Sequence, residues 1–169
     1  PSVYQKRRRT MKPEKIKVYR TLEGNIFELV FLILLIAVWV FIIIALQKAP
    51  DIVPTHFDAA GRPNSYGSKF GILIPTIITT IAAVSMMVCA YFPHKINLPT
   101  QITTPHQYEL AIRMLRIMGL ILLALTASIG YMSLVLGAHG APSAVPILAV
   151  VGLLFVVIIV FTFLIYKAK

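Results

Sequence analysis

The sequence is poor in cysteine and in acidic residues. Among its 169 residues there are one cysteine, Cys89, and only six aspartates and glutamates. A single cysteine excludes an intrachain disulfide framework and a metal site made of several cysteines. Because Cys89 lies inside an apolar run, we expect it to be a buried packing residue. No complete catalytic set can be assembled from the other residues, so the sequence predicts a protein that is not an enzyme and needs no cofactor.

Charged residues are also almost absent from four long apolar runs. Hydrophobic residues make up 58% of the chain, against roughly 45–50% in soluble proteins. The runs cover about residues 26–46, 70–92, 112–136 and 146–166. Each reaches the length of about 20 residues that a spanning helix needs. The sequence therefore predicts an all-α polytopic protein, in which residues 26–169 form a single four-helix membrane domain surrounded by the lipid bilayer.

Basic residues fall mainly on one side of these spans. The net charge is +10, and eight of the sixteen lysines and arginines lie between Lys6 and Arg20. This run has no aromatic interleaving and leads directly into a span, so it indicates a membrane-flanking anchor, and we expect no nucleic-acid partner. Only three basic residues lie on the opposite side: Lys48, Arg62 and Lys69. Both termini are therefore predicted to be cytoplasmic, with residues 1–25 as a basic cytoplasmic segment.

The third helix is expected to begin before its apolar run. Thr104 can act as the N-cap, Pro105 as the first helical residue and Gln107 as the partner in a capping box. Glu109 and Arg113 stand one turn apart and are expected to pair.

Small residues predict how the helices meet. On the second and third spans they recur at helical spacing, which permits close approach and interhelical hydrogen bonds. The strip on the third span is Ala127, Gly130, Ser133 and Gly137, and that on the second is Thr76, Thr79, Thr80 and Ala83. The first and fourth spans are rich in large aliphatic residues, which favours contact with lipid, with another membrane protein or with a second copy of the chain.

The outward connection between the first two spans is the candidate functional site. It covers residues 47–69 and exceeds the roughly 12–15 residues beyond which unstructured connections become uncommon. Turns are predicted at residues 58–61 and 62–65. Aromatic residues within it favour an ordered loop that packs on the helix ends. The candidate recognition residues are Pro54, His56, Phe57, Asp58, Gly61, Pro63, Tyr66, Gly67 and Lys69.

Several roles remain open for the charged residues of this loop. His56 and Asp58 are two positions apart and could bind a metal, orient one another, sense pH or form hydrogen bonds within the loop. Lys69 could pair with Asp58 or mark the membrane interface. A weak metal hypothesis adds His139 from the second outer loop, but these residues lack a compact zinc-type spacing. A transporter or a membrane enzyme is less favoured, because the span centres hold no ionisable group.

The outer segment resembles a known family signature. The residues that carry the resemblance are Pro54, Thr55, His56 and Phe57, followed by Gly61, Pro63, Tyr66, Gly67 and Lys69. Together they resemble the DUF1648 family of bacterial integral membrane proteins, over about residues 40–87. That family includes the N-terminal part of the SdpI immunity protein, a signalling partner for a secreted killing factor. The resemblance implies a multi-pass protein of the bacterial cytoplasmic membrane and no catalytic role for these residues.

Two functions follow as hypotheses. In the first, the outer loop of a non-enzymatic membrane protein recognises a peptide, toxin or protein partner, in immunity or in signalling. In the second, the chain is a structural or accessory subunit of a larger membrane complex, held there by its first and fourth spans.

Overall fold

The computed structural model describes residues 18–58, 60–95, 102–140 and 143–168. Most of the basic segment predicted at residues 1–25 lies outside this part of the chain. The helices are α2 (Leu22–Lys48), α3 (Leu73–Cys89), α4 (Pro105–Gly130) and α5 (Val145–Lys167). The shorter elements are β1 (Ile52–Phe57), β2 (Pro63–Ser68), the 3₁₀ turns η1 (Lys69–Ile72) and η2 (Pro93–Lys95), and a π-helical turn, η3 (Tyr131–Leu136).

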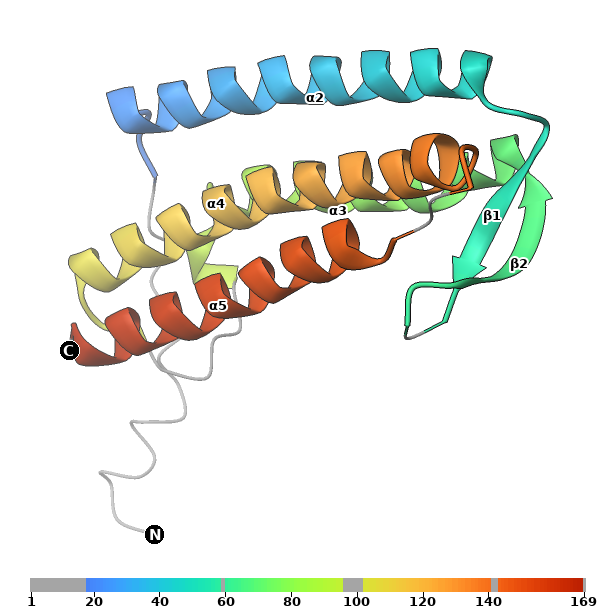
Figure 1. The fold of residues 1–169 in the computed structure, drawn as a ribbon. Coiled ribbons are helices and arrows are strands. Elements are labelled where there is room, and N and C mark those ends of the chain that lie inside the picture. Colours follow the sequence, from blue (N-terminus) through green and yellow to red (C-terminus); the bar gives the residue numbers. More distant parts are fainter. Residues whose placement is uncertain (1–17, 59, 96–101, 141–142, 169) are drawn as a thin grey trace, which may run out of the picture.

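Four of these helical segments are long and apolar enough to cross a membrane, which confirms the predicted polytopic fold. They run over Leu22–Lys48, Lys69–Cys89, Pro105–Leu136 and Val145–Lys167. The start of α2 and the end of α5 lie at one end of the bundle, and β1 and β2 lie at the other (Figure 1). This arrangement agrees with two termini on the same side of the membrane; the cytoplasmic assignment of that side stays a prediction.

Helix α4 is the centre of the bundle and packs against each of the other three helices. Glycines let its backbone approach its neighbours closely. A Cβ atom at Gly119 would lie 3.2 Å from the carbonyl oxygen of Ala83 on α3, and one at Gly130 would lie 3.2 Å from Cγ1 of Ile42 on α2. Gly130, a member of the predicted strip of small residues on the third span, therefore lies at a helix contact.

Hydroxyl groups join the helices within the apolar bundle. The Oγ1 atoms of Thr79 and Thr126 lie 2.8 Å apart between α3 and α4. The indole N–H of Trp39 on α2 donates to Oγ1 of Thr80 at 3.2 Å. Both contacts use threonines of the predicted strip on the second span, and they satisfy polar groups where lipid offers no partner.

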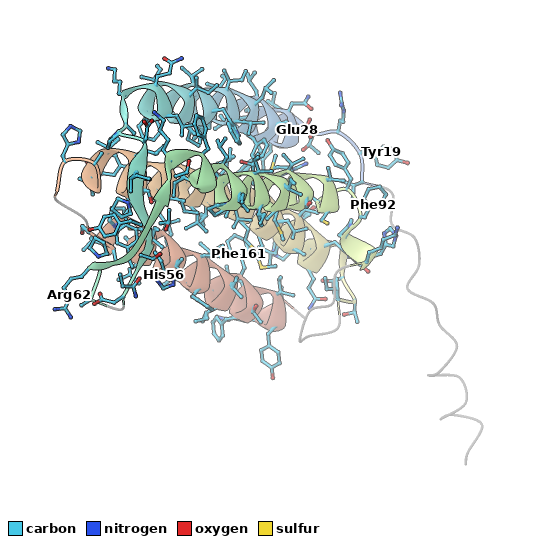
Figure 2. The ribbon with its side chains drawn as sticks, turned by 90° about the vertical axis from the view of Figure 1, so that its right-hand side faces the viewer. Tyr19, Glu28, His56, Arg62, Phe92 and Phe161 are labelled. Carbon is cyan, nitrogen blue, oxygen red and sulfur yellow. The ribbon has the colours of Figure 1, made fainter. Side chains whose placement is uncertain are left out.

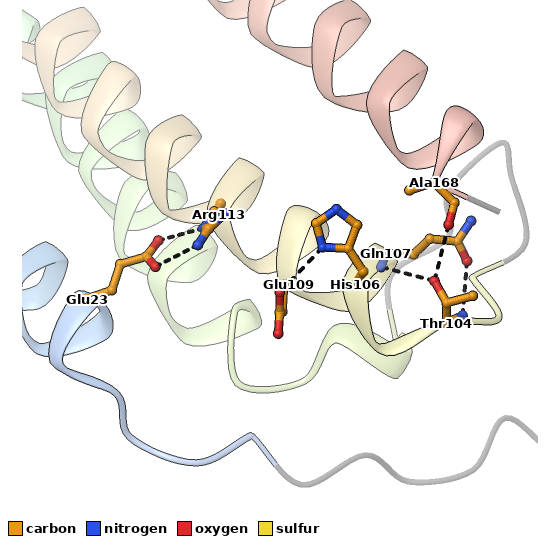
Figure 3. Close-up of polar contacts among 7 residues, drawn as sticks. All are labelled: Glu23, Thr104, His106, Gln107, Glu109, Arg113 and Ala168. Atoms are coloured by element: carbon orange, nitrogen blue, oxygen red, sulfur yellow. Dashed lines mark hydrogen bonds and ion pairs between the residues drawn. The ribbon is translucent and has the colours of Figure 1, made fainter.

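The first turn of α4 has the predicted capping box. Oγ1 of Thr104 accepts from the backbone N–H of Gln107, and the Gln107 side chain accepts from the backbone N–H of Thr104 (Figure 3). The predicted attraction of Glu109 to Arg113 is present only as a weaker electrostatic interaction, without a direct contact between the two side chains. Arg113 instead donates to both carboxylate oxygens of Glu23 on α2, at 2.7 and 2.9 Å. A bidentate guanidinium–carboxylate contact is stronger than a surface pair one turn apart.

The outward faces of α2 and α5 carry many exposed aliphatic and aromatic side chains, and on α5 only Ile165 is buried. The prediction of a buried Cys89 is wrong, because its side chain is exposed. Helix α3 packs through Thr76, Ala83 and Met87. Cys89 follows Met87 by two residues, about 200° around the helix, and so lies on another face. An apolar run in a membrane protein includes lipid-facing positions as well as packing positions.

Candidate functional site

The predicted outer loop is a two-stranded antiparallel hairpin. Strands β1 and β2 pair with Val53 opposite Gly67 and Pro54 opposite Tyr66, and irregular register follows at His56 (Figure 1). The turn predicted at residues 58–61 is confirmed by the hydrogen bond from the N–H of Gly61 to the carbonyl of Asp58. The turn predicted at residues 62–65 is wrong, because β2 already begins at Pro63. Proline is tolerated there because it is the first residue of a strand.

The base of the hairpin is embedded in the helical core. Val53 is fully buried and belongs to a cluster with Ile42 of α2, Ile72 of η1 and Leu134 of η3. Burying an aliphatic side chain of this size stabilises a fold by about 1.5–3 kcal/mol. The hairpin is therefore an extension of the bundle core and not a free loop.

Lys69 closes this base. Its Nζ donates to the carbonyl of Ala49 at 3.0 Å and pairs with the carboxylate of Asp51 at 3.2 Å. Its backbone N–H donates to the carbonyl of Asp51 at 2.9 Å. The alternative pairing with Asp58 is wrong, since Asp58 lies at the turn and has other partners. Lys69 thus joins the end of α2 to the start of η1.

Two further contacts hold the hairpin against the connection between α4 and α5. Pro54 is buried, and a Cβ atom at Gly137 would lie 2.8 Å from its ring atoms. Gly61 adopts a positive φ of 78°, and a Cβ atom there would lie 2.8 Å from the backbone nitrogen of Ala144. Only glycine fits both the turn geometry and this close approach. The base and the turn of the hairpin are therefore both attached to the bundle.

Asp58 organises the turn. Its Oδ1 accepts from the backbone N–H groups of Ala60 and Arg62 at 2.9 and 2.8 Å, and its Oδ2 accepts from Nε of Arg62 at 3.1 Å. The hydrogen bond from the backbone of Arg62 is the largest influence on the Asp58 carboxyl. With the contributions of Ala60 and of the Arg62 side chain, it holds the pKa of Asp58 below its ordinary value, because these donors favour the charged form.

His56 bonds across the hairpin and not to Asp58. Its Nδ1 lies 2.6 Å from Oδ1 of Asn64 on β2. Since an amide oxygen only accepts, Nδ1 carries the hydrogen in this arrangement. Of the roles that the sequence left open for His56, the structure shows a hydrogen bond within the loop.

The remaining candidate residues of the hairpin divide into exposed and half-buried ones. Tyr66 is 63% exposed and Ile52 is 61% exposed, and His56 is exposed as well. Phe57, Pro63 and Gly67 are half-buried. Figure 2 shows His56 and Arg62 at the hairpin end of the molecule, far from Glu28 and Phe92. Of the nine predicted residues, Pro54, Gly61 and Lys69 attach the hairpin, while His56 and Tyr66 face outward.

The residues of the metal hypothesis do not gather in the part of the chain that the structure describes. Nδ1 of His139 lies 2.6 Å from the carbonyl oxygen of Val135 one turn earlier, while His56 and Asp58 have the hairpin partners given above. No group of three or more His, Cys, Asp or Glu side chains suited to a metal ion occurs within residues 18–58, 60–95, 102–140 and 143–168.

Asn64, Asp51 and Gly137 shape the site in roles that the sequence did not predict. Asn64 forms a hydrogen bond with His56, and Asp51 forms an ion pair with Lys69. Gly137 allows the ring of Pro54 to approach the backbone closely. A hairpin signal was present, because the turn at residues 58–61 lies between two short segments of similar length. The contacts with Gly137 had no local signal, since they join positions far apart in the chain.

Comparison with known proteins confirms the predicted resemblance. Residues 33–80 match the family model described as "Domain of unknown function (DUF1648)". The matched range covers the second half of α2, the hairpin, η1 and the first turns of α3. The chain is also similar to an uncharacterized protein of Archaeoglobus fulgidus, with 33% identity over 76 residues. That alignment covers 40% of this chain and 42% of the relative, so the chain spans less than half of the relative's length. No solved structure matches the chain.

Proposed function

We propose that this chain is a non-enzymatic membrane protein whose outer hairpin recognises a peptide, toxin or protein partner. The observation that carries the proposal is a hairpin attached to the bundle at its base and turn, with His56 and Tyr66 left exposed. A surface held in one conformation loses less conformational entropy on binding than a flexible loop does. Tyrosine is also enriched among the residues that dominate binding energy.

Strand β2 supplies a second element of recognition. Among the described residues, β2 pairs only with β1. Its other edge can accept an extended peptide by strand addition, in which backbone hydrogen bonds give affinity and alternate side chains give specificity. An extended segment of a partner is therefore the favoured form of ligand.

In this proposal the hairpin faces the outside of a bacterial cytoplasmic membrane. The orientation is supported by the excess of basic residues at the opposite end of the spans. An immunity or signalling role, which the resemblance of the outer segment to the family of the SdpI immunity protein implies, fits a membrane protein that detects a secreted ligand.

Site-specific photocrosslinking in native membranes tests the proposal. A benzophenone amino acid replaces Tyr66, and we expect a discrete adduct with a peptide or protein. The adduct should be lost when His56→Ala is added and kept when His106→Ala is added, because His106 is an exposed histidine at the other end of the bundle. The absence of any peptide or protein adduct at position 66 would contradict the proposal.

The second candidate function is that of an accessory subunit. It is favoured by α5, whose outward face has large exposed side chains such as Phe155, Ile159 and Phe163. The same crosslinker at Phe163 distinguishes the two functions. A stoichiometric membrane-protein adduct at position 163, with none at position 66, supports the subunit, and lipid adducts alone at position 163 argue against it.

A further inference from the structure

Helices α2 and α3 are joined by polar contacts and not by close packing. Within the described part of the chain both helices pack against α4, and they make few contacts with one another. The indole N–H of Trp39 donates to Oγ1 of Thr80, and the hydroxyl of Tyr91 donates to the carboxylate of Glu28. These two hydrogen bonds bridge α2 and α3 at two levels of the bundle and leave a space between them.

This space contains an apolar groove of about 440 Å³, beside the contact of Tyr91 with Glu28. Its lining residues are Glu28, Val84, Met87, Val88, Tyr91 and Phe92. Those from α3 and the turn after it recur at spacings of three and four, so they form one face of the helix. Met87 is buried, whereas Val84, Val88 and Phe92 are exposed. The surface that lines the groove is apolar, and we call it the α2–α3 groove.

The width of the α2–α3 groove suits a hydrocarbon chain and not a helix. Its lining runs from Val84 to Phe92, which is about 12 Å at 1.5 Å per residue. A volume of 440 Å³ over that length leaves a cross-section of roughly 37 Å². A helix with a diameter of about 10–12 Å needs roughly 80–110 Å². A helix of a partner protein is therefore too wide for the groove.

The length of the space corresponds to one leaflet of a bilayer. The two bridging contacts lie about 16 Å apart along α2, from Glu28 to Trp39. The hydrocarbon core of a bilayer is about 30 Å thick, so one leaflet contributes roughly 15 Å. Because the groove lies along two spanning helices and its exposed residues face away from the bundle core, acyl chains are the molecules that reach it.

The end of the groove near Tyr91 has cations beside it. Nζ of Lys95 lies 5.2 Å from the centre of the Phe92 ring, and the charge of Arg20 acts electrostatically on the hydroxyl of Tyr91. Both cations lie just outside the spans, at the level of lipid headgroups. They complement the phosphate that a phospholipid carries at the head of its acyl chains. Glu28 is the acidic residue of the lining, and its carboxylate is engaged by Tyr91.

We propose that the α2–α3 groove holds one acyl chain of a membrane phospholipid, with the lipid phosphate beside Lys95 and Arg20. The bound chain fills the apolar space that α2 and α3 leave between them. The proposal is independent of the recognition function, because the groove residues Glu28 and Phe92 lie far from the hairpin (Figure 2).

Native mass spectrometry of the full chain tests the proposal. The chain is released from membranes in maltoside micelles and washed with the same detergent, which removes weakly held lipids. We expect one phospholipid to stay bound to each chain. After harsher delipidation, palmitoyl-oleoyl phosphatidylglycerol should raise the unfolding midpoint, because a ligand that binds only the folded state stabilises it.

Variants that fill the groove separate this site from general contact with lipid. Val84→Phe and Val88→Phe each add volume inside the groove at an exposed position. Either should weaken phospholipid retention roughly tenfold or more, and each serves if the other fails to fold. Val156→Phe makes the same change at an exposed position of α5 and should retain the lipid as the native chain does. Lys95→Gln should weaken retention by removing a cation beside the phosphate.

Three results would overturn the proposal. The first is a native chain that keeps no phospholipid, or that keeps a polypeptide in its place. The second is equal retention by Val156→Phe and by both groove variants, which would show that the lipid binds elsewhere. The third is unchanged retention by Lys95→Gln, which would contradict the placement of the phosphate.

Discussion

The Nζ atom of Lys69 lies 3.0 Å from the carbonyl oxygen of Ala49, so a lysine at the start of η1 caps the end of α2. The last carbonyls of a helix have no partner within the helix, and a cation there also interacts favourably with the helix dipole. The same ammonium pairs with Asp51, just before β1. One side chain therefore ties together the two chain segments from which the hairpin rises.

Replacing Lys69 with methionine should loosen the hairpin. Lys69→Met keeps much of the side-chain volume but removes the donor to a partly buried carbonyl, which costs about 1–3 kcal/mol. We expect faster cleavage within residues 47–69 in limited proteolysis of the purified chain. Lys48→Met is the control, because Lys48 is exposed at the end of α2. Equal cleavage of the two variants would show that Lys69 does not hold the base.

The spans were predictable because their signal is local. A run of about 20 apolar residues identifies a spanning helix without knowledge of its neighbours, and α2 and α5 match the predicted runs within a few residues. The capping box at Thr104 is local for the same reason, since its members lie within one turn. The partner of Arg113 was not predictable, because Glu23 lies on another helix and enters its reach only after packing.

Gly61 should tolerate alanine less well than Gly140 does. Both glycines have positive φ values, 78° and 72°. A side chain at Gly140 meets open space, whereas one at Gly61 meets the backbone of Ala144. Gly140→Ala should therefore cost only the backbone strain, about 1–2 kcal/mol, and Gly61→Ala should cost more. Thermal unfolding of both variants in one detergent measures the difference. Equal midpoints would mean that the contact with Ala144 contributes nothing.

The position of the outer site could be predicted from the sequence, but the roles of its residues could not. Its polar, turn-rich composition distinguished residues 47–69 from the spans, and the turn at Asp58 followed from local residue preferences. The roles of the individual residues in this loop depend on how the two strands pair, and the presence of a lysine or a histidine in the sequence does not reveal that pairing. The sequence suggested Lys69 as a recognition residue, but its ammonium bonds to the carbonyl of Ala49. The sequence also suggested that His56 could contact Asp58, but His56 bonds to Asn64 on β2.

The turn of the hairpin should weaken in acid. The pKa of Asp58 is lowered, first by the hydrogen bond from the backbone of Arg62, so the charged carboxylate is the form that the folded turn favours. This stabilisation is complete above the ordinary pKa of an aspartate and is lost as the pH falls through the lowered value of the folded state. The amide chemical shift of Arg62 in an NMR titration should report that lowered midpoint.

Asp58→Asn is the matched variant for this titration. Asparagine keeps an oxygen that accepts from the N–H groups of Ala60 and Arg62, so the turn should form. It cannot titrate, and the acid-dependent shift of the Arg62 amide should disappear. If the shift persists in Asp58→Asn, another group is responsible for it.

Gln107 should be among the least replaceable polar residues of the bundle. It is fully buried; its Oε1 accepts from the backbone N–H groups of Thr103 and Thr104, and its Nε2 donates to the carbonyl of Ile165 at 2.8 Å. It thus joins the start of α4 to the end of α5. Gln107→Ala leaves the buried carbonyl of Ile165 without this partner, at about 1–3 kcal/mol, and also removes the acceptor for the N–H groups of Thr103 and Thr104. Gln107→Glu keeps the acceptor but places a charged oxygen toward the Ile165 carbonyl, so it should destabilise the chain as well.

Gln47→Ala, at an exposed position near the end of α2, is the control and should leave the unfolding midpoint unchanged. A midpoint for Gln107→Ala equal to that of Gln47→Ala would show that the junction of α4 and α5 does not depend on this side chain.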